Sequence, residues 1–190
     1  MISCFLMGGL GNQLFQIFAT IGYSLKNKIP FKFEYSEILT TGVHRPTYWN
    51  NFLKNLSIFT NKEQLHFPLY KEQNYHYNEI PYIKDNFKLY GYFQSYKYFE
   101  KEYKHIKKYI KLKEQQESVK QEFPEYNIEN TISIHFRLGD YLKIQQHHPI
   151  MKLEYYIESL RKIINYNKTY NVLYFCQEED NEIVIKNIEK

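Results

Sequence analysis

Long apolar segments are missing from this sequence of 190 residues. No stretch approaches the roughly 20 apolar residues that a helix needs to cross a bilayer. The first apolar run, residues 2–7, has no positive charge before it and ends in Gly8 and Gly9. It therefore predicts a strand rather than a signal peptide. We expect a protein that is cytoplasmic, or peripheral to a membrane and held there by a partner.

Cysteine, glycine and proline are also scarce, with 2, 7 and 6 residues. Cys4 and Cys176 lie within apolar runs that predict buried strands, where a reduced thiol packs as a small hydrophobic group. Two reduced structural thiols fit a cytosolic compartment. The sequence has no internal repeat and no low-complexity linker, and its hydrophobic content of 43% is enough for one core or two small lobes.

The charge balance is mildly basic, with a net charge of +4 and an isoelectric point near 8.8. Such an excess suits a diphosphate ligand or an anionic surface, and alone it does not choose between them. A basic nucleic-acid-binding protein is a third possibility, with an affinity that falls steeply with salt. Neither the basic residues nor the aromatic residues are clustered enough to favour it, so we expect no nucleic-acid partner.

The amino-terminal half predicts a parallel sheet. A β-prone run at residues 2–7 is followed by a glycine loop, and then by apolar residues at helical spacing between Leu14 and Leu25. Alternating aromatic residues at 31–35 predict the next strand. A strand, helix and strand in this order imply an α/β fold.

The remaining pattern predicts a second unit of the same type. Residues 39–85 are irregular, with short helices expected around Tyr48 to Leu56. A strand is expected at 87–93, and helices are expected near 99–110 and 115–123. After Pro124 come a strand at 131–136, a helix at 153–164, a strand at 172–176 and the start of another helix at Asp180. We therefore predict two domains, residues 1–125 and 126–190, the second of them with an incomplete sheet.

The loop Gly8-Gly-Leu-Gly-Asn-Gln13 is the first candidate binding element. Glycines such as Gly9 and Gly11 let backbone amides approach a ligand, at a helix end whose dipole favours anions. Asn12 and Gln13 stand where either a helix cap or a ligand contact is possible. The alternative is a tight turn without a ligand, and the spacing is neither the dinucleotide fingerprint nor a phosphate-binding loop with its lysine.

The second candidate is His135-Phe-Arg-Leu-Gly-Asp140, at the carboxyl end of a predicted strand, where open α/β sheets bind their ligands. Side-chain alternation places His135 and Arg137 on one face. A guanidinium there can hold a diphosphate through two parallel hydrogen bonds. The alternatives are an ion pair of Arg137 with Asp140 and a hydrogen-bonded core histidine at position 135.

Three motifs in order carry a family resemblance: Gly-Gly-Leu-Gly-Asn-Gln-Leu-Phe-Gln from Gly8, Gly-Tyr-Phe-Gln-Ser-x-Lys-Tyr-Phe from Gly91, and His-x-Arg-x-Gly-Asp-Tyr from His135. With Leu153-Glu-Tyr-Tyr156 and the strand before Gln177, the chain resembles α-1,2-fucosyltransferases over almost its whole length. The resemblance implies a two-lobed GT-B-like fold with a Rossmann-like amino-terminal lobe on the acceptor side. It also implies GDP-fucose as donor, inversion at the anomeric carbon, a galactose-containing glycan as acceptor, and no metal or other cofactor.

The resemblance also implies roles for single residues. Arg137 would contact the donor diphosphate with His135 beside it, and the loop with Gly9, Gly11 and Gln13 would reach the same cleft, with Asn12 as its main contact.

Direct displacement also needs a base near the acceptor hydroxyl. Asp140 and His148 are the candidates, although Asp140 is more simply a partner of Arg137 and His148 part of a polar loop. The acidic residues 178–180 suggest either a metal-nucleotide site or a helix cap, and we favour the cap.

One feature of that family is absent. Its members continue beyond the length of this sequence with an Asn-Ser-Ser/Thr-Phe-Ser-Trp-Trp-like segment that helps to hold the nucleotide, whereas the only tryptophan here is Trp49. We expect a fragment, a natural truncation, or half of a split gene whose second chain completes the donor lobe. The alternative function is an inactive nucleotide- or carbohydrate-binding remnant of the fold.

Overall fold

The computed structural model describes residues 1–125 and 128–189, apart from the side chains of Ile128 and Asp140. It shows two compact units, Met1–Ser118 and Val119–Lys190, and the division falls within helix α3 (Leu112–Glu122). The sequence-based boundary was placed later, after residue 125. The architecture is mixed α/β with small parallel sheets, as the order of predicted strands and helices indicated.

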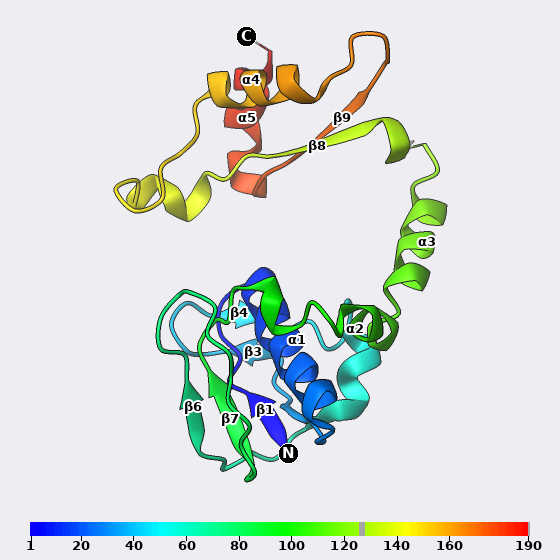
Figure 1. Ribbon diagram of the computed structural model, residues 1–190. Helices are drawn as coiled ribbons and strands as arrows, with labels where there is room; N and C mark the ends of the chain where they lie inside the picture. The colour runs from blue at the N-terminus through cyan, green and yellow to red at the C-terminus, as the bar shows by residue number, and fades with distance from the viewer. Residues whose placement is uncertain (126–127, 190) are drawn as a thin grey trace. The chain divides into compact units, whose positions relative to one another are not determined.

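A parallel sheet forms the centre of the first unit (Figure 1). Strand β7 (Phe87–Tyr90) pairs with β1 (Ile2–Cys4) on one side and with β6 (Leu69–Lys71) on the other. An isolated parallel bridge between Ile2 and Phe31 leads from β1 towards β2 (Phe33–Glu34), which pairs with β5 (Thr60–Asn61). These are two sheets, β6-β7-β1 and β2-β5, joined by this bridge, and because every pairing is parallel the carboxyl ends of their strands point the same way.

The other elements of this unit are shorter. They are the antiparallel pair β3 (Ile38–Leu39) and β4 (Arg45–Pro46), the 3-10 helices η1 (Lys54–Phe59) and η2 (Tyr96–Tyr98), and the helix α2 (Tyr103–Tyr109). The irregular segment expected between residues 39 and 85 thus contains four short strands and one 3-10 helix.

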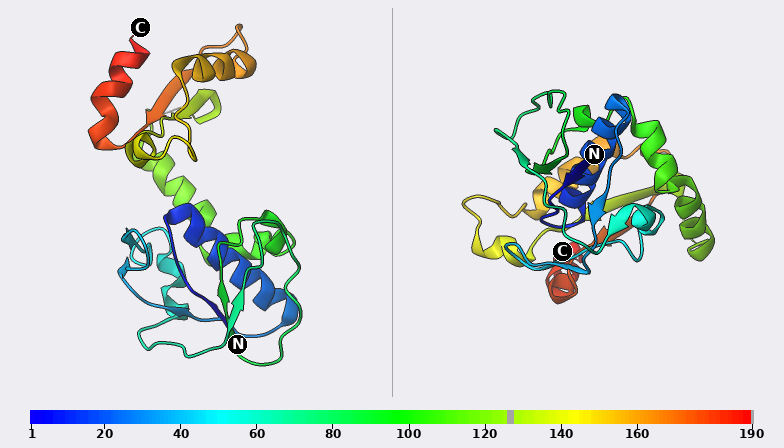
Figure 2. Two further views of the ribbon diagram at one scale, coloured as in Figure 1. Left: turned by 90° about the vertical axis from the view of Figure 1, so that its left-hand side faces the viewer. Right: turned by 90° about the horizontal axis from the view of Figure 1, so that it is seen from below.

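Helix α1 (Leu10–Asn27) packs against the sheet (Figures 1 and 2). Its buried side chains include Gln13, Ile17, Ile21 and Ser24, and this spacing of three and four residues makes one continuous face. The helix ends at Lys28, which adopts a left-handed conformation with φ 55° and donates its backbone N–H to the last turn.

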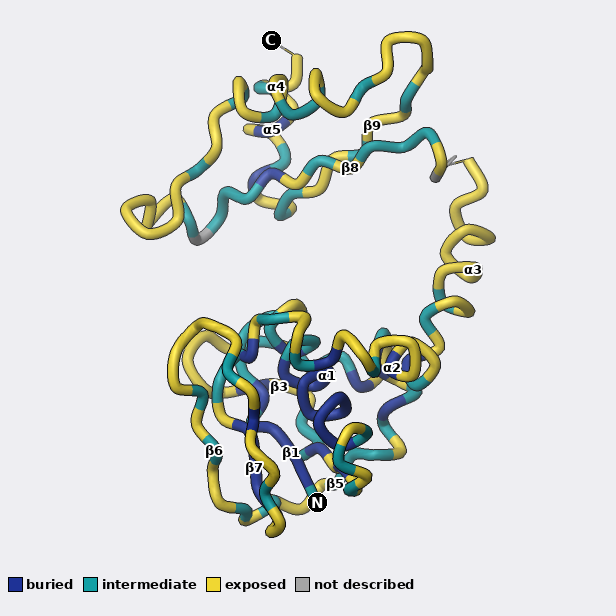
Figure 3. The backbone as a smooth tube through the Cα atoms, in the orientation of Figure 1, coloured by how far each residue is buried: buried dark blue, intermediate teal, exposed yellow. Residues whose placement is uncertain are grey.

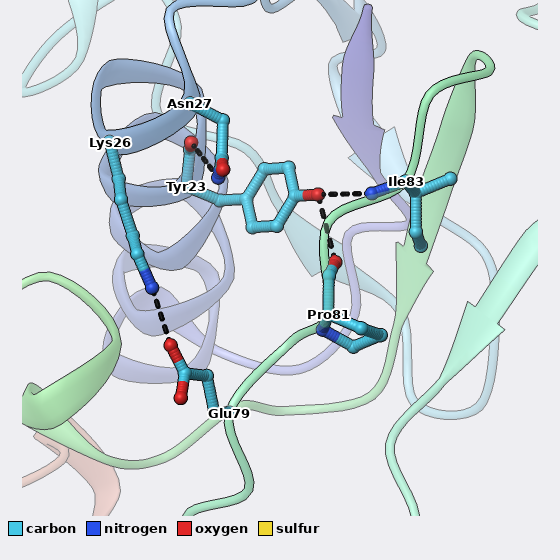
Figure 4. A network of polar contacts seen from close by, with 6 residues as sticks. All are labelled: Tyr23, Lys26, Asn27, Glu79, Pro81 and Ile83. Carbon is cyan, nitrogen blue, oxygen red and sulfur yellow. Dashed lines mark hydrogen bonds and ion pairs between the residues drawn. The ribbon is translucent and has the colours of Figure 1, made fainter.

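A buried tyrosine ties this helix to the chain before β7 (Figure 4). The Tyr23 hydroxyl donates to the Pro81 carbonyl at 2.9 Å and accepts from the Ile83 amide at 2.9 Å. Burial raises the pKa of Tyr23 above its ordinary value of 10.0. One turn later, the exposed Lys26 pairs with Glu79 at 2.5 Å. The two contacts fix where the chain enters its central strand.

The second unit contains one parallel pair of strands, β8 (Thr131–His135) and β9 (Asn171–Phe175), in register from Thr131 with Asn171 to His135 with Phe175. Its helical elements are η3 (Ile128–Asn130), η4 (Gly139–Lys143), α4 (Leu153–Ile163), η5 (Glu178–Asp180) and α5 (Asn181–Ile188). The predicted order of strand, helix, strand and helix is confirmed.

The two units differ in how many of their residues are buried (Figure 3). The first has a core of 21 buried hydrophobic residues, whereas the buried residues described in the second are Phe136, Asp180 and Val184. Helix α4 has no buried side chain although its pattern is strongly amphipathic. The prediction that Cys176 lies in a buried strand is wrong, because it follows β9 and is only half-buried. Cys4 is buried as predicted.

None of the helices described is both long enough and apolar enough to span a membrane.

Candidate functional site

The glycine loop follows β1 at the carboxyl edge of the sheet. Gly8 has φ +77°, and a Cβ added to it would lie 2.3 Å from the Asn12 amide nitrogen, so this turn requires glycine. Gly9 is the N-cap of α1 and makes no side-chain cap bond. A Cβ on Gly9 or Gly11 would meet nothing within 4 Å. The space in front of these two residues is open, as a ligand-binding loop requires.

Asn12 and Gln13 have separate positions, and neither caps the helix. The Asn12 side-chain oxygen accepts a hydrogen bond from Gln94 Nε2 at 2.7 Å near the surface. Gln13 is fully buried, and its Nε2 donates to the carbonyls of Gly8 at 2.9 Å and Pro46 at 3.0 Å. Gln13 therefore supports the loop from inside, and Asn12 is the amide that a ligand can reach. Their donor-binding roles stay predictions.

The sequence motif beginning at Gly91 lies beside this loop. Besides the Asn12–Gln94 hydrogen bond, the ring of Phe99 packs on those of Phe15 and Phe18, with centroids 6.0 and 5.5 Å apart. A Cβ on Gly22 would lie 2.6 Å from the Tyr98 carbonyl, so α1 is in close backbone contact with the motif. Two of the three motifs therefore form one structural unit.

Glu72 holds the second motif in place, and sequence reasoning missed it. Its carboxylate accepts the backbone amides of Tyr92 at 2.7 Å and Phe93 at 3.0 Å. These bonds accompany an unusual backbone, with φ +154° at Gly91 and +51° at Phe93. The isolated glutamate in an irregular segment gave no signal, because its partners are backbone groups about 20 residues away in sequence.

Gln16 makes a similar contact below the glycine loop, and it was also missed. It is fully buried; its Oε1 accepts the Met7 amide at 3.1 Å and its Nε2 donates to the Met7 carbonyl at 3.3 Å. Together with Gln13 it satisfies backbone groups that the chain leaves unpaired where it passes from β1 into α1. Gln13 and Gln16 are three residues apart and therefore lie on one face of the helix, a spacing that could have indicated their shared role.

In the second unit, His135 and Arg137 lie at the carboxyl end of β8. His135 is the exposed last residue of the strand, which excludes the buried core histidine considered from the sequence. The guanidinium of Arg137 lies over the ring of Tyr141, with Cζ 4.8 Å from the ring centroid. Tyr141 in turn stacks on the ring of His148 at 4.6 Å. The stack presents a planar cation at the strand end.

The turn after Arg137 is closed by residues that follow β9. The Gly139 amide donates to Asp180 Oδ2 at 2.8 Å, and a Cβ on Gly139 would lie 1.7 Å from Gln177 Oε1. Gly139 has φ +42°, so both its backbone and its surroundings require glycine. The side chain of Asp140 lies outside the described residues, so its proposed pairing with Arg137 stays a prediction.

The acidic residues 178–180 form the 3-10 turn that leads into α5. Their place at a helix start agrees with the cap interpretation, but the buried Asp180 makes no side-chain cap bond and instead fixes Gly139. Among the residues described, no group of three or more His, Cys, Asp and Glu side chains is arranged to hold a metal ion.

Comparisons of this chain with protein-family models, with curated proteins and with solved structures found no match.

Proposed function

We propose that this chain belongs to an α-1,2-fucosyltransferase, with a Rossmann-like acceptor-side lobe in the first unit and part of a GDP-fucose-binding lobe in the second, in a GT-B-like arrangement. The observation that carries the proposal is the position of Arg137. It follows a parallel strand at the edge where such sheets bind ligands, and its guanidinium is stacked on Tyr141.

The arrangement suits the departure of a nucleoside diphosphate. In the proposed reaction the acceptor 2-hydroxyl oxygen bonds to the anomeric carbon of fucose as the bond from that carbon to the diphosphate oxygen breaks. GDP leaves with the electron pair, and the hydroxyl proton passes to a base. A guanidinium held in place can stabilise the charge that develops on the diphosphate by about 3 kcal/mol. Asp140 and His148 remain the candidates for the base.

Titration calorimetry of the full chain with GDP and GDP-fucose, beside GDP-mannose and ADP, tests the donor site. We expect selective binding of the first two ligands. Arg137→Ala should weaken it by at least about tenfold, since hydrogen bonds to charged groups contribute about 1.5–3 kcal/mol. Arg161→Ala, which removes an exposed arginine from α4, is the matched control and should bind as the unchanged chain does.

Equal GDP affinity in Arg137→Ala and Arg161→Ala would refute the role of Arg137. Circular dichroism of both variants checks that the fold is retained.

A non-catalytic remnant is the second candidate, and the sparse burial of the second unit favours it. An active transferase releases GDP from GDP-fucose only when a galactose-containing acceptor is present. A remnant binds GDP weakly and releases none in either condition. A coupled assay for GDP with and without lactose, both on the chain alone, separates the two.

A further inference from the structure

A pocket of about 270 Å³ lies at the carboxyl edge of the first unit's sheet, separate from the glycine loop. Its walls come from the residues that directly follow three parallel strands: Phe5 and Leu6 after β1, Ser36 after β2, and Lys62 and Gln64 after β5. The carboxyl ends of parallel strands are where α/β sheets place their ligands. The position therefore points to a binding site independently of any sequence motif.

Glu34 lines this pocket and is held by a buried ion pair. Its Oε1 accepts the Lys88 ammonium at 2.7 Å and the Leu65 amide at 2.6 Å. The Lys88 side chain is 6% exposed and that of Glu34 is 26% exposed. Removing two charges from water is costly, so such a pair is weak evidence for stability. The position of Glu34 in the wall of the pocket makes it a candidate for ligand binding.

The pair leaves one hydrogen-bond acceptor available. With Oε1 occupied twice, the second oxygen of Glu34 accepts no hydrogen bond from the residues that the structure describes. Lys88 fixes the carboxylate and balances its charge. Glu34 thus offers the pocket a positioned acceptor without strong negative charge.

The other lining groups indicate the class of ligand. Hydroxyls of Ser36 and Thr40, the amide of Gln64 and the ammonium of Lys62 supply donors and acceptors, and the ring of Tyr35 adds an apolar surface. The charges of Lys62 and Glu63 offset each other, and Glu34 is offset by Lys88. Because each carboxylate is offset by a lysine, the pocket has no excess positive charge to attract a phosphate, whereas a neutral ligand rich in hydroxyl groups matches this mixture.

We propose that this pocket binds a neutral saccharide, with a sugar hydroxyl donating to Glu34. Its identity as the acceptor subsite rests on the proposed function. Saccharide binding itself does not depend on that function.

Saturation-transfer NMR on the full chain tests the pocket, with lactose and methyl β-galactoside as probes and inorganic phosphate added as an anionic competitor, which should leave the saccharide signals unchanged. Thr40→Trp fills the pocket from an exposed position, and Thr169→Trp, at an exposed position outside the first unit, is its matched control. We expect saccharide signals in the unchanged chain and in Thr169→Trp, and at least tenfold weaker binding in Thr40→Trp. Equal saccharide binding in both variants, or no saccharide signal in the unchanged chain, overturns the proposal.

A second variant tests Glu34 directly. Glu34→Met combined with Lys88→Met removes both members of the ion pair together with the acceptor oxygen, so that neither charge is left buried alone. Saccharide affinity should fall about tenfold while circular dichroism stays unchanged, and an unchanged affinity contradicts the role of Glu34.

GDP titration of the same samples keeps the two proposals distinct. Saccharide binding that is sensitive to Thr40→Trp, without GDP binding, supports the pocket and refutes a donor site formed by this chain alone. GDP binding without saccharide binding does the reverse.

Discussion

At the scale of single residues, the turn after β8 depends on a glycine that contacts two polar side chains. The Gly139 amide is bound by the buried Asp180, and the side chain of Gln177 fills the space where a Cβ would lie. Gln177 Oε1 has no hydrogen-bond partner among the described residues. The position of Arg137 relative to the strand end is therefore fixed by residues about 40 positions later in the sequence.

Gly139→Ala should disrupt this turn and lower GDP affinity by about tenfold or more, the factor that 1.4 kcal/mol produces. The new methyl group collides with Gln177, and a left-handed backbone is unfavourable for alanine. Gly42→Ala is the control, because Gly42 has φ +72° but open space around it. It should lower the melting temperature slightly and leave GDP titration unchanged. Equal GDP affinity in both variants would contradict the role of the turn.

At Ser3 the side-chain hydroxyl lowers the stability of the folded chain. It is fully buried, and its Oγ has no hydrogen-bond partner among the described residues. Ser3→Ala should therefore raise the free energy of unfolding by about 1 kcal/mol. Thr20→Val is the contrasting change, because Thr20 Oγ1 donates to the Gln16 carbonyl at 2.8 Å, and its loss should be destabilising. Urea unfolding of both variants measures the two signs, and a destabilised Ser3→Ala would show that the hydroxyl has a partner.

Cys4 makes stability depend on pH in the alkaline range. Burial raises the pKa of its thiol from 9.0 to about 12, so the folded chain retains a proton that the unfolded chain releases. This contribution to stability is complete below pH 9 and is lost as the pH rises from 9 towards 12, at about 1.4 kcal/mol per pH unit. Urea unfolding at pH 8 and pH 10.5 should show a smaller loss in Cys4→Ala than in the unchanged chain. Parallel losses in both would contradict this assignment.

At the scale of elements, the spacing of apolar residues predicted those helices and strands that have an apolar period of their own. The alternation and helical spacing located α1, β7, β8, α4 and β9 within a few residues, because each has its own apolar period. They missed β3, β4, β5 and β6, which are two or three residues long and exist only through their partners. The burial of Cys176 was mispredicted because an apolar run predicts burial only where other elements cover it.

The same distinction applies to the candidate sites. The glycine loop and the residues 135–140 were visible as motifs, and the structure places each at the carboxyl end of a parallel strand. Glu72 was not identified, and the contacts of Gln16 and Asp180 with backbone amides were not predicted, because those amides are distant in sequence. The Glu34–Lys88 pair could not be predicted either, since it requires the register of separate strands.

The junction between α1 and the chain before β7 can be tested through Tyr23. Tyr23→Phe removes both hydrogen bonds of the hydroxyl and leaves the Pro81 carbonyl and the Ile83 amide without their partner. The free energy of unfolding should fall by about 1–3 kcal/mol. Lys26→Ala, which removes only the exposed pair with Glu79 one turn away, should unfold like the unchanged chain. Urea denaturation that ranks the two variants the other way would contradict the importance of this contact.

At the scale of the whole molecule, the two units differ in how much structure protects them. β1 and β7 are buried on both faces, as parallel strands normally are. β9 has Val172, Tyr174 and Phe175 exposed by 38% or more, and α4 buries no side chain. Local opening costs little free energy where few apolar contacts must be broken. The second unit should therefore open far more often than the first.

Hydrogen exchange of the full chain, followed by mass spectrometry, measures this difference. Peptides covering β1 and β7 should exchange slowly, and those covering β8 and β9 should exchange much faster under the same conditions. Saturating GDP should slow hydrogen exchange in residues 131–144, because a ligand that binds only the folded form of this segment stabilises that form by mass action. GDP should have no such effect in Arg137→Ala. Equally slow exchange in both units would contradict the inference from burial, whereas unchanged exchange with GDP would contradict only the donor site.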